Sequence, residues 1–195
     1  MSAHAQPRLS EQEYLEAERK AEFRHQFYDG IVYAMSGGSP SHAFIIASLS
    51  RELGNALKKR PCQVASSDLR IRVSESGLYT YPDVVVVCGD LKFADDQRDT
   101  VINPALLIEV LSPSTEAYDR GFKSEQYRKL ESLQEYALVS QAYPHIEIFR
   151  RQATNEWLLS EFNNLDQTCH VESVGCSIPL AEIYDKIKFE ETPFL

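Results

Sequence analysis

A nearly continuous apolar stretch at residues 105–111 carries one charged side chain, Glu109, and this feature constrains the fold more than any other. Pro104 precedes the stretch and a polar segment, 112–114, follows it, so its length is that of a buried strand. An unpaired charge inside such a strand costs roughly several kcal/mol. Glu109 is therefore expected to be neutral, paired with a cation or bound to a metal ion.

The segment after this strand contains a partner for Glu109. Residues 121–130 have the apolar spacing of a helix. Spacings of three, four and seven place four side chains on one helical face: Lys123, Gln126, Tyr127 and Leu130. Lys123 begins this face, near the end of the strand, and is the predicted neighbour of Glu109.

The length and composition favour a single globular domain over residues 1–195. The chain has 195 residues, of which 43% are apolar and 25% are charged. No apolar run approaches the roughly 20 residues that span a bilayer. Residues 1–9 also lack the basic-then-apolar layout of a secretory signal. We therefore expect a cytoplasmic protein that makes no membrane contact.

Charge and cysteine spacing exclude several classes of site. The net charge of -9 weighs against a protein that coats nucleic acid through long-range attraction, although it leaves room for a local basic groove. No C-x-x-C pair is present, which argues against a zinc ribbon or a thioredoxin-type site. The pattern favours reduced, partly buried thiols at the four cysteines: Cys62, Cys88, Cys169 and Cys176.

Start and stop signals predict a mixture of helices and strands. Ser10 and Glu13 form a capping box for a first helix that ends near residue 21, and Asp29-Gly30 suits a type I′ turn between two antiparallel strands. Ser39 and Pro40 begin a second helix, with His42 in its first turn and Ala56 on its buried stripe. The predicted strands are 23–28, 31–35, a bent strand over 62–73, 79–88, 105–111, 136–140, 146–150, 157–162 and 171–178, and the last helix is 180–187. This order predicts an α+β fold, or an α/β fold with a mixed sheet.

Two of the buried strands each carry one carboxylate, Asp83 and Glu109. If these strands are neighbours, both carboxylates and the backbone carbonyl of Val110 converge on one divalent cation. Ligation by oxygen alone suits Mg²⁺ or Mn²⁺ better than Zn²⁺. Such an ion, with Lys123 nearby, suits hydrolysis of a phosphodiester. A purely structural network of ion pairs is the alternative interpretation.

Other hydrolytic and nucleotide-binding classes lack their motifs. The chain has no G-x-S-x-G nucleophile elbow. No phosphate-binding G-x-x-x-x-G-K-[ST] and no dinucleotide-binding G-x-G-x-x-G follows a predicted strand. A glycosidase pair of carboxylates fits poorly with acids on buried strands beside a lysine.

A set of motifs in order along the chain resembles the Uma-type family, a bacterial branch of the PD-(D/E)XK nuclease superfamily whose members are classed with restriction endonucleases. The segments that carry the resemblance cover nearly the whole chain: YDG at 28–30, GGSPSH at 37–42, SSDLR at 66–70, YPD at 81–83, IEVLSPS at 108–114, YDRGFK at 118–123 and PLAEIY at 179–184.

The resemblance implies a restriction-endonuclease-like core, in which helices flank a central mixed sheet. It implies that Asp83 and Glu109 bind the metal ion. The superfamily often has a lysine two residues after the glutamate, where this chain has Leu111, and Lys123 matches the lysine that the family carries on the following helix. Asp68 matches a further acidic position, and Gln126 is a predicted helper one turn after Lys123.

The chain departs from the family pattern just before the Asp-Gly turn. The family usually has an acidic residue where this chain has Gln26, which alters any metal or water contact made there. Glu22 is a nearby acid that compensates only if it reaches the same place.

Two functions follow as hypotheses. The first is a Mg²⁺-dependent endodeoxyribonuclease that uses Asp83, Glu109 and Lys123, with Asp68 and His42 as auxiliary ligands or phosphate contacts. Basic residues that would contact DNA phosphates are Arg70, Arg72, Arg120, Arg128 and Lys129. The second is a catalytically inactive module that binds nucleic acid or protein, which the acidic net charge and Gln26 favour. A homodimer is expected under either hypothesis, because a two-fold assembly suits a duplex.

Overall fold

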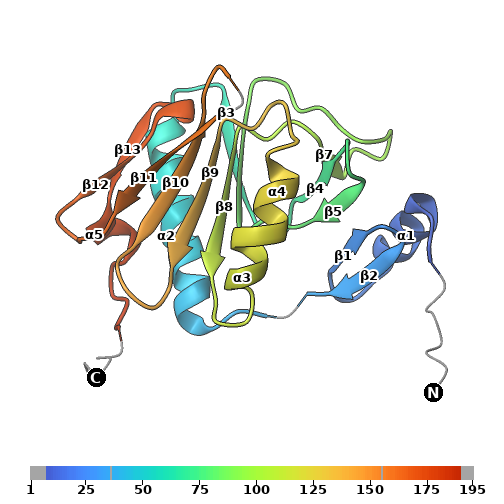
Figure 1. Cartoon of the computed structure of the whole chain (residues 1–195), viewed down its shortest axis with the longest axis horizontal. Helices are drawn as coiled ribbons and strands as arrows, with labels where there is room; N and C mark the ends of the chain where they lie inside the picture. The colour runs from blue at the N-terminus through green and yellow to red at the C-terminus, as the bar shows by residue number, and fades with distance from the viewer. Residues whose placement is uncertain (1–7, 36, 155, 190–195) are drawn as a thin grey trace.

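The computed structural model describes residues 8–35, 37–154 and 156–189, and contains two larger β-sheets and one small one (Figure 1). The predictions that concern residues 1–7 lie outside the described residues. The helical segments are α1 (Glu11–Glu18), α2 (Pro40–Leu57), α3 (Glu116–Tyr118), the π-helical turn η1 (Asp119–Lys123), α4 (Ser124–Tyr127), the 3-10 turn η2 (Glu172–Val174) and α5 (Leu180–Ile183).

The six-stranded sheet forms the centre of the molecule. Its order is β11-β10-β9-β8-β6-β3, and among the strand pairs of the described residues only β8 and β9 are parallel. The strands are β3 (Cys62–Ser66), β6 (Val84–Cys88), β8 (Leu106–Leu111), β9 (Glu135–Ser140), β10 (Ile146–Arg151) and β11 (Trp157–Phe162). The parallel pair is joined by the segment α3-η1-α4, as expected of a strand-helix-strand connection. This mixed sheet with its helices confirms the predicted α+β class.

Different elements cover the two faces of this sheet. Helix α2 packs on one face, where its buried residues Ile45 and Leu49 join Val84, Ile108 and Val139 in a single core. Figure 1 shows α2 behind the sheet and α3 and α4 in front of it. Because side chains alternate along a strand, the residues between those core positions point toward the front.

The front face has a second core. Val85, Leu107 and Leu138 of the central sheet pack there with Tyr127 of α4 and with Ile71 of the five-stranded sheet. The five-stranded sheet has the order β2-β1-β5-β4-β7, built from β1 (His25–Tyr28), β2 (Ile31–Ala34), β4 (Arg70–Val73), β5 (Leu78–Thr80) and β7 (Thr100–Val101). The third sheet pairs β12 (Thr168–Val171) with β13 (Cys176–Pro179).

Several local predictions are confirmed. Ser10 and Glu13 form both hydrogen bonds of a capping box, and Ser39 caps α2 with Pro40 at its first turn. Asp29 and Gly30 have φ values of 48° and 78°, so both turn positions are left-handed as a type I′ turn requires. The β1-β2 pairing that follows is antiparallel.

Two predicted strands are wrong, because each is divided between the two large sheets. Residues 62–73 form β3 in the central sheet and β4 in the five-stranded sheet, with a turn at Ser67 and Asp68. Residues 79–88 likewise contain the end of β5 and all of β6, with Pro82 between them. The apolar pattern continues across both breaks because each sheet buries its segment in a core, so hydrophobicity alone did not reveal where the chain changes sheets.

Several helix boundaries and one strand also differ from prediction. Helix α1 ends at Glu18, earlier than predicted. In place of the predicted helix 121–130, the consecutive helical segments α3, η1 and α4 run from Glu116 to Tyr127. Ala56 of α2 is exposed, because the buried stripe is narrower than predicted. The predicted strand 171–178 is divided between β12 and β13, which pair with each other and are joined by η2. Gly175, directly after η2, adopts a left-handed φ of 60°. The last helix is shorter than predicted and spans α5 only.

The prediction of four reduced thiols is wrong for one pair. Cys62 and Cys88 form a disulfide, while Cys169 and Cys176 are free and buried. The two bonded cysteines face each other across the antiparallel β3-β6 pair. The two cysteines are 26 residues apart, which matches no known cysteine motif. The strand register, and not the local sequence, brings them together.

The disulfide is expected to stabilise the fold by about 3 kcal/mol, because it closes a long loop in the unfolded chain. Cys62→Ser should lower the free energy of unfolding in urea by this amount under oxidising conditions. With excess reductant the wild type should unfold at the denaturant concentration of the variant. A wild-type curve that does not respond to reductant would contradict the bond, and Cys176→Ser, which removes a free thiol, is the control.

Within the described residues, no helix is long and apolar enough to cross a membrane. The single domain and the cytoplasmic location stay predictions.

Candidate active site

Asp83 and Glu109 lie side by side on the front face of the central sheet. Strands β6 and β8 are antiparallel neighbours, and Val84 pairs with Ile108. Asp83 and Glu109 lie opposite each other one position beyond that pair. Because side chains alternate along a strand, both point to the face opposite that of Val84 and Ile108. The backbone N–H of Val110 donates a hydrogen bond of 2.8 Å to Oδ2 of Asp83, which ties the two strands together at this point.

Glu109 is held in the interior by a lysine and a tyrosine. It is 2% exposed, and its Oε1 lies 3.1 Å from Nζ of Lys123 and accepts a bond of 2.7 Å from the hydroxyl of Tyr127. Burial raises the pKa of Glu109 to about 8; the charge of Lys123 counteracts part of this rise and the carboxylate of Asp83 adds to it. Lys123 thus provides the partner that the strand sequence required.

Lys123 is positioned by the π-helical turn. It ends η1 and contacts two carboxylates, since its Nζ also lies 2.9 Å from Oδ1 of Asp119, at the start of the same turn. Burial lowers the pKa of Lys123, but Glu109 and Asp119 more than offset this and the net shift is upward. The buried ammonium therefore remains charged at neutral pH. A π-helical turn inside a helix frequently marks a functional site.

His42 links helix α2 to the same place. Its Nε2 lies 3.1 Å from Oδ2 of Asp83. Burial lowers the pKa of His42, but the hydrogen bond and charge of Asp83 outweigh it, and the net shift is upward. A Cβ on Gly38 would clash with the imidazole of His42, so the glycine leaves the space that this ring occupies.

The oxygen atoms at this point fit a hard divalent cation. Within the described residues, the contacts of the two carboxylates use Oδ2 of Asp83 and Oε1 of Glu109, which leaves the second oxygen of each for a ligand. Asp83, Glu109 and the carbonyl of Val110 are the residues that would hold Mg²⁺ or Mn²⁺.

Two of the predicted auxiliary residues lie away from these groups. Asp68 is in the turn between β3 and β4, where its 76% exposed side chain pairs with Arg24. Gln126 is buried, but its Oε1 accepts a bond of 3.0 Å from Lys129. Neither lines the cavity described next, and neither is part of the site that we propose below.

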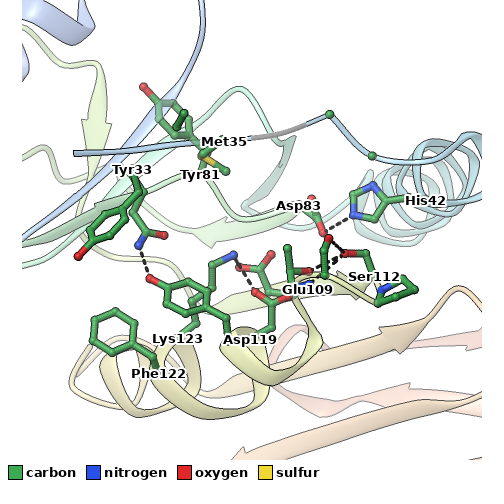
Figure 2. A pocket seen from close by; sticks show the side chains of 18 of the residues that line it. Tyr33, Met35, His42, Tyr81, Asp83, Glu109, Ser112, Asp119, Phe122 and Lys123 are labelled. Carbon is green, nitrogen blue, oxygen red and sulfur yellow. Dashed lines mark hydrogen bonds and ion pairs between the residues drawn. The ribbon is translucent and has the colours of Figure 1, made fainter. Parts of the chain in front are cut away.

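A cavity of about 750 Å³ opens in front of Asp83, Glu109 and Lys123. Figure 2 shows these residues on its floor with His42 beside Asp83. Gln26 also lines it: its amide donates to the hydroxyl of Tyr118 and accepts a bond of 3.1 Å from Thr80. Both ends of the amide are therefore engaged. Glu22 is exposed and is not among the lining residues, so it does not take the place of that acid.

Sequence reasoning missed part of this site. Asp119 is 2% exposed and pairs with Lys123, and the spacing of four residues between them on a helix was a usable signal. The aromatic residues of the cavity come from the five-stranded sheet, from the segment between β5 and β6, from α3 and from η1, and no local pattern connects them. Most of the basic residues that were predicted to contact phosphates pair with acids: Arg70 with Asp99, Arg72 with Glu11, Arg120 with Glu116 and Glu147, and Lys129 with Glu125.

A second cluster of ionisable groups lies elsewhere. His145, Glu147 and Glu161 bring one ligand atom each to within 4.8 Å of the others. Nε2 of His145 lies 2.8 Å from Glu147, and Glu147 in turn pairs with Arg120 at 2.6 Å. These residues were not predicted from the sequence, because the pairing of β10 with β11 brings Glu147 and Glu161 together.

Comparison with known proteins identifies the family. A profile of the Uma2 family, described as "Putative restriction endonuclease", matches residues 11–181. The chain belongs to the Uma2 family. The resemblance stated from the motifs is confirmed, and membership indicates a nuclease-type hydrolase whose substrate is a nucleic acid.

Relatives of this Uma2 chain include two proteins of Synechocystis sp. (strain ATCC 27184 / PCC 6803 / Kazusa). "Uncharacterized protein slr1290" is 37% identical over 94% of this chain and 95% of its own length. "Uncharacterized protein sll1609" is 35% identical over 78% of this chain and 86% of its own length.

A solved structure supports the fold of this Uma2 protein. The crystal structure of "a putative nuclease belonging to DUF820 from Anabaena variabilis ATCC 29413" superposes with a TM-score of 0.72. The match covers 90% of this chain and 97% of that one at 17% identity. The restriction-endonuclease-like fold is thereby confirmed.

Proposed function

We propose that this protein is a Mg²⁺-dependent endonuclease that hydrolyses phosphodiester bonds of DNA. One observation carries the proposal: two carboxylates from neighbouring strands, Asp83 and Glu109, meet at the floor of a cavity with the buried ammonium of Lys123 against one of them. Membership of a family classed with restriction endonucleases supports the same chemistry.

Each residue has a distinct role in this proposal. Asp83, Glu109 and the carbonyl of Val110 hold the cation, which when bound supplies Lewis acidity at the scissile phosphate. Lys123 stabilises negative charge that develops on the phosphate in the transition state and orients the attacking water. His42 fixes the carboxylate of Asp83 through its contact of 3.1 Å, and Asp119 fixes the ammonium of Lys123 through its contact of 2.9 Å.

A catalytically inactive binding module is the second candidate. The observation that favours it is Gln26, which lies in the cavity where the family usually has an acid. Its amide is engaged by Thr80 and Tyr118, so it contributes no negative charge toward a cation. A module that only binds DNA or protein has no need of a metal ion at Asp83 and Glu109.

Metal dependence separates the two candidates. Purified protein freed of metal with EDTA should leave supercoiled plasmid intact, and added Mg²⁺ or Mn²⁺ should restore nicking or linear product. Ca²⁺, which binds oxygen ligands with a looser geometry, should support binding and little cleavage. Plasmid and single-stranded DNA that both stay intact with every metal, together with no heat of Mg²⁺ binding in calorimetry, would contradict the nuclease and favour the binding module. The predicted homodimer is tested in the same preparation by light scattering.

A further inference from the structure

The cavity has two chemically different ends. Figure 2 shows His42 and Asp83 at one end and Tyr33 and Phe122 at the other, with Lys123 on the floor between them. The first end carries the acids and the histidine. The second end is a wall of aromatic rings, and the proposed chemistry uses none of them.

The aromatic wall consists of Tyr28, Tyr33, Tyr118 and Phe122, which come from four elements (β1, β2, α3 and η1). The ring of Phe122 lies 5.2 Å from that of Tyr118 in a stacked arrangement, and 4.8 Å from that of Tyr28 at an angle of 76°. Gln26 on β1 donates to the hydroxyl of Tyr118 on α3, which fixes that ring across the cavity. Rings held in this way lose little conformational entropy when a flat ligand stacks on them.

Tyr33 is the most exposed residue of this wall. It pairs with Gln26 in the β1-β2 register, so it stands next to the residue that anchors Tyr118. The side of β2 on which it lies is open, and 46% of Tyr33 is exposed. A large aromatic residue that remains half exposed at the mouth of a cavity is available to a ligand.

Positive charge is scarce in the cavity. Among the described residues that line it, only His42 and Lys123 are basic, and both already face carboxylates. Proteins that hold duplex DNA along its length depend on many lysine and arginine contacts to phosphates. Proteins that bind unpaired strands gain affinity by stacking bases on aromatic side chains, which needs no particular sequence.

The geometry points to an unpaired nucleotide of DNA as the group that this cavity accepts, either in a single strand or in an unpaired bulge of a duplex. Its base stacks on the wall of Tyr33, Tyr118 and Phe122, and its phosphate lies at Asp83 and Glu109. The volume of about 750 Å³ is that of a pocket for a small ligand and not of a groove for a duplex. This inference rests on the proposed nuclease function and specifies its substrate.

The test uses one labelled oligonucleotide in three forms: single-stranded, paired with an unpaired bulge, and fully paired. Cleavage is measured with Mg²⁺ and binding with Ca²⁺ for wild type, Tyr33→Ala and Tyr33→Phe. Leu159→Ala is the matched control, since Leu159 is 44% exposed but lies on β11 away from the cavity lining.

Wild type should cut the single-stranded and bulged forms and spare the paired form. Tyr33→Ala should raise the KM for the unpaired forms about tenfold with little change in kcat, because a stacked base contributes roughly 1–3 kcal/mol. Tyr33→Phe, which keeps the ring, and Leu159→Ala should behave as wild type.

Equal cleavage of all three forms, with a KM that does not respond to Tyr33→Ala, would overturn the unpaired substrate and leave the nuclease standing. Binding of single strands that needs Tyr33 but never leads to cleavage would support the aromatic site and remove the catalytic proposal. Absence of both binding and cleavage would overturn both.

Discussion

Glu109→Gln is expected to lower kcat/KM for DNA cleavage by roughly 10³-fold, a loss in the range seen when one preorganised electrostatic contact to a transition state is removed. The substitution takes away a negative metal ligand but keeps the size of the side chain and its ability to accept the hydrogen bond of Tyr127. The fold should therefore persist. Calorimetry should show a matching loss of Mg²⁺ affinity, and cleavage of a single-stranded oligonucleotide gives the rate.

The chain contains a close control for this variant. Glu135 is a second fully buried glutamate, at the start of the adjacent strand β9, where it pairs with Arg150 and accepts bonds from Ser173. Glu135→Gln should lower stability and leave kcat/KM per folded molecule unchanged. If both substitutions reduced cleavage equally, Glu109 would act through stability alone and its role as a ligand would be refuted.

Lys123→Met should reduce kcat by roughly 10²- to 10³-fold while the protein still binds Mg²⁺, since the ammonium acts on charge in the transition state and not on the cation. The same change leaves Glu109 and Asp119 buried without their shared positive partner. Breaking a buried ion pair in this way costs about 3–5 kcal/mol. Single-turnover cleavage and urea unfolding measure the two effects separately.

A second variant keeps this prediction testable if Lys123→Met fails to fold. Combining Lys123→Met with Asp119→Asn removes one of the two carboxylates that have lost their positive partner. The double variant should recover part of the lost stability without recovering kcat. Lys129→Met, two residues beyond Tyr127 and partly exposed, is the control for loss of a lysine from the same region. Restoration of cleavage in the double variant would show that Lys123 has only a structural role.

The parts of the fold that local chemistry determines were predictable from the sequence. The capping box at Ser10, the left-handed pair at Asp29 and Gly30 and the buried strand around Glu109 each depend on a few consecutive residues. The proximity of Glu109 to Lys123 followed in the same way, because a charge inside an apolar strand requires a partner.

The remainder depends on contacts between distant segments. Nothing local distinguishes a strand that bends from one that leaves its sheet, so the breaks at Asp68 and Pro82 were not anticipated. The disulfide of Cys62 and Cys88 is a product of strand register, as is the position of Tyr33 beside Gln26. The π-helical turn changes which side chains share a face, and a count based on 3.6 residues per turn does not detect it.

The hairpin that carries Tyr33 has one further consequence. Strand β2 is the outermost strand of the five-stranded sheet, whereas the acids and the lysine belong to the central sheet and to the segment that joins β8 to β9. Of the three rings in the proposed stacking site, Tyr33 alone lies outside the segment that carries Lys123, and an edge hairpin tolerates exchange far better than a central strand. Transplanting residues 25–34 from one relative into another should exchange substrate preference while the reaction itself is retained.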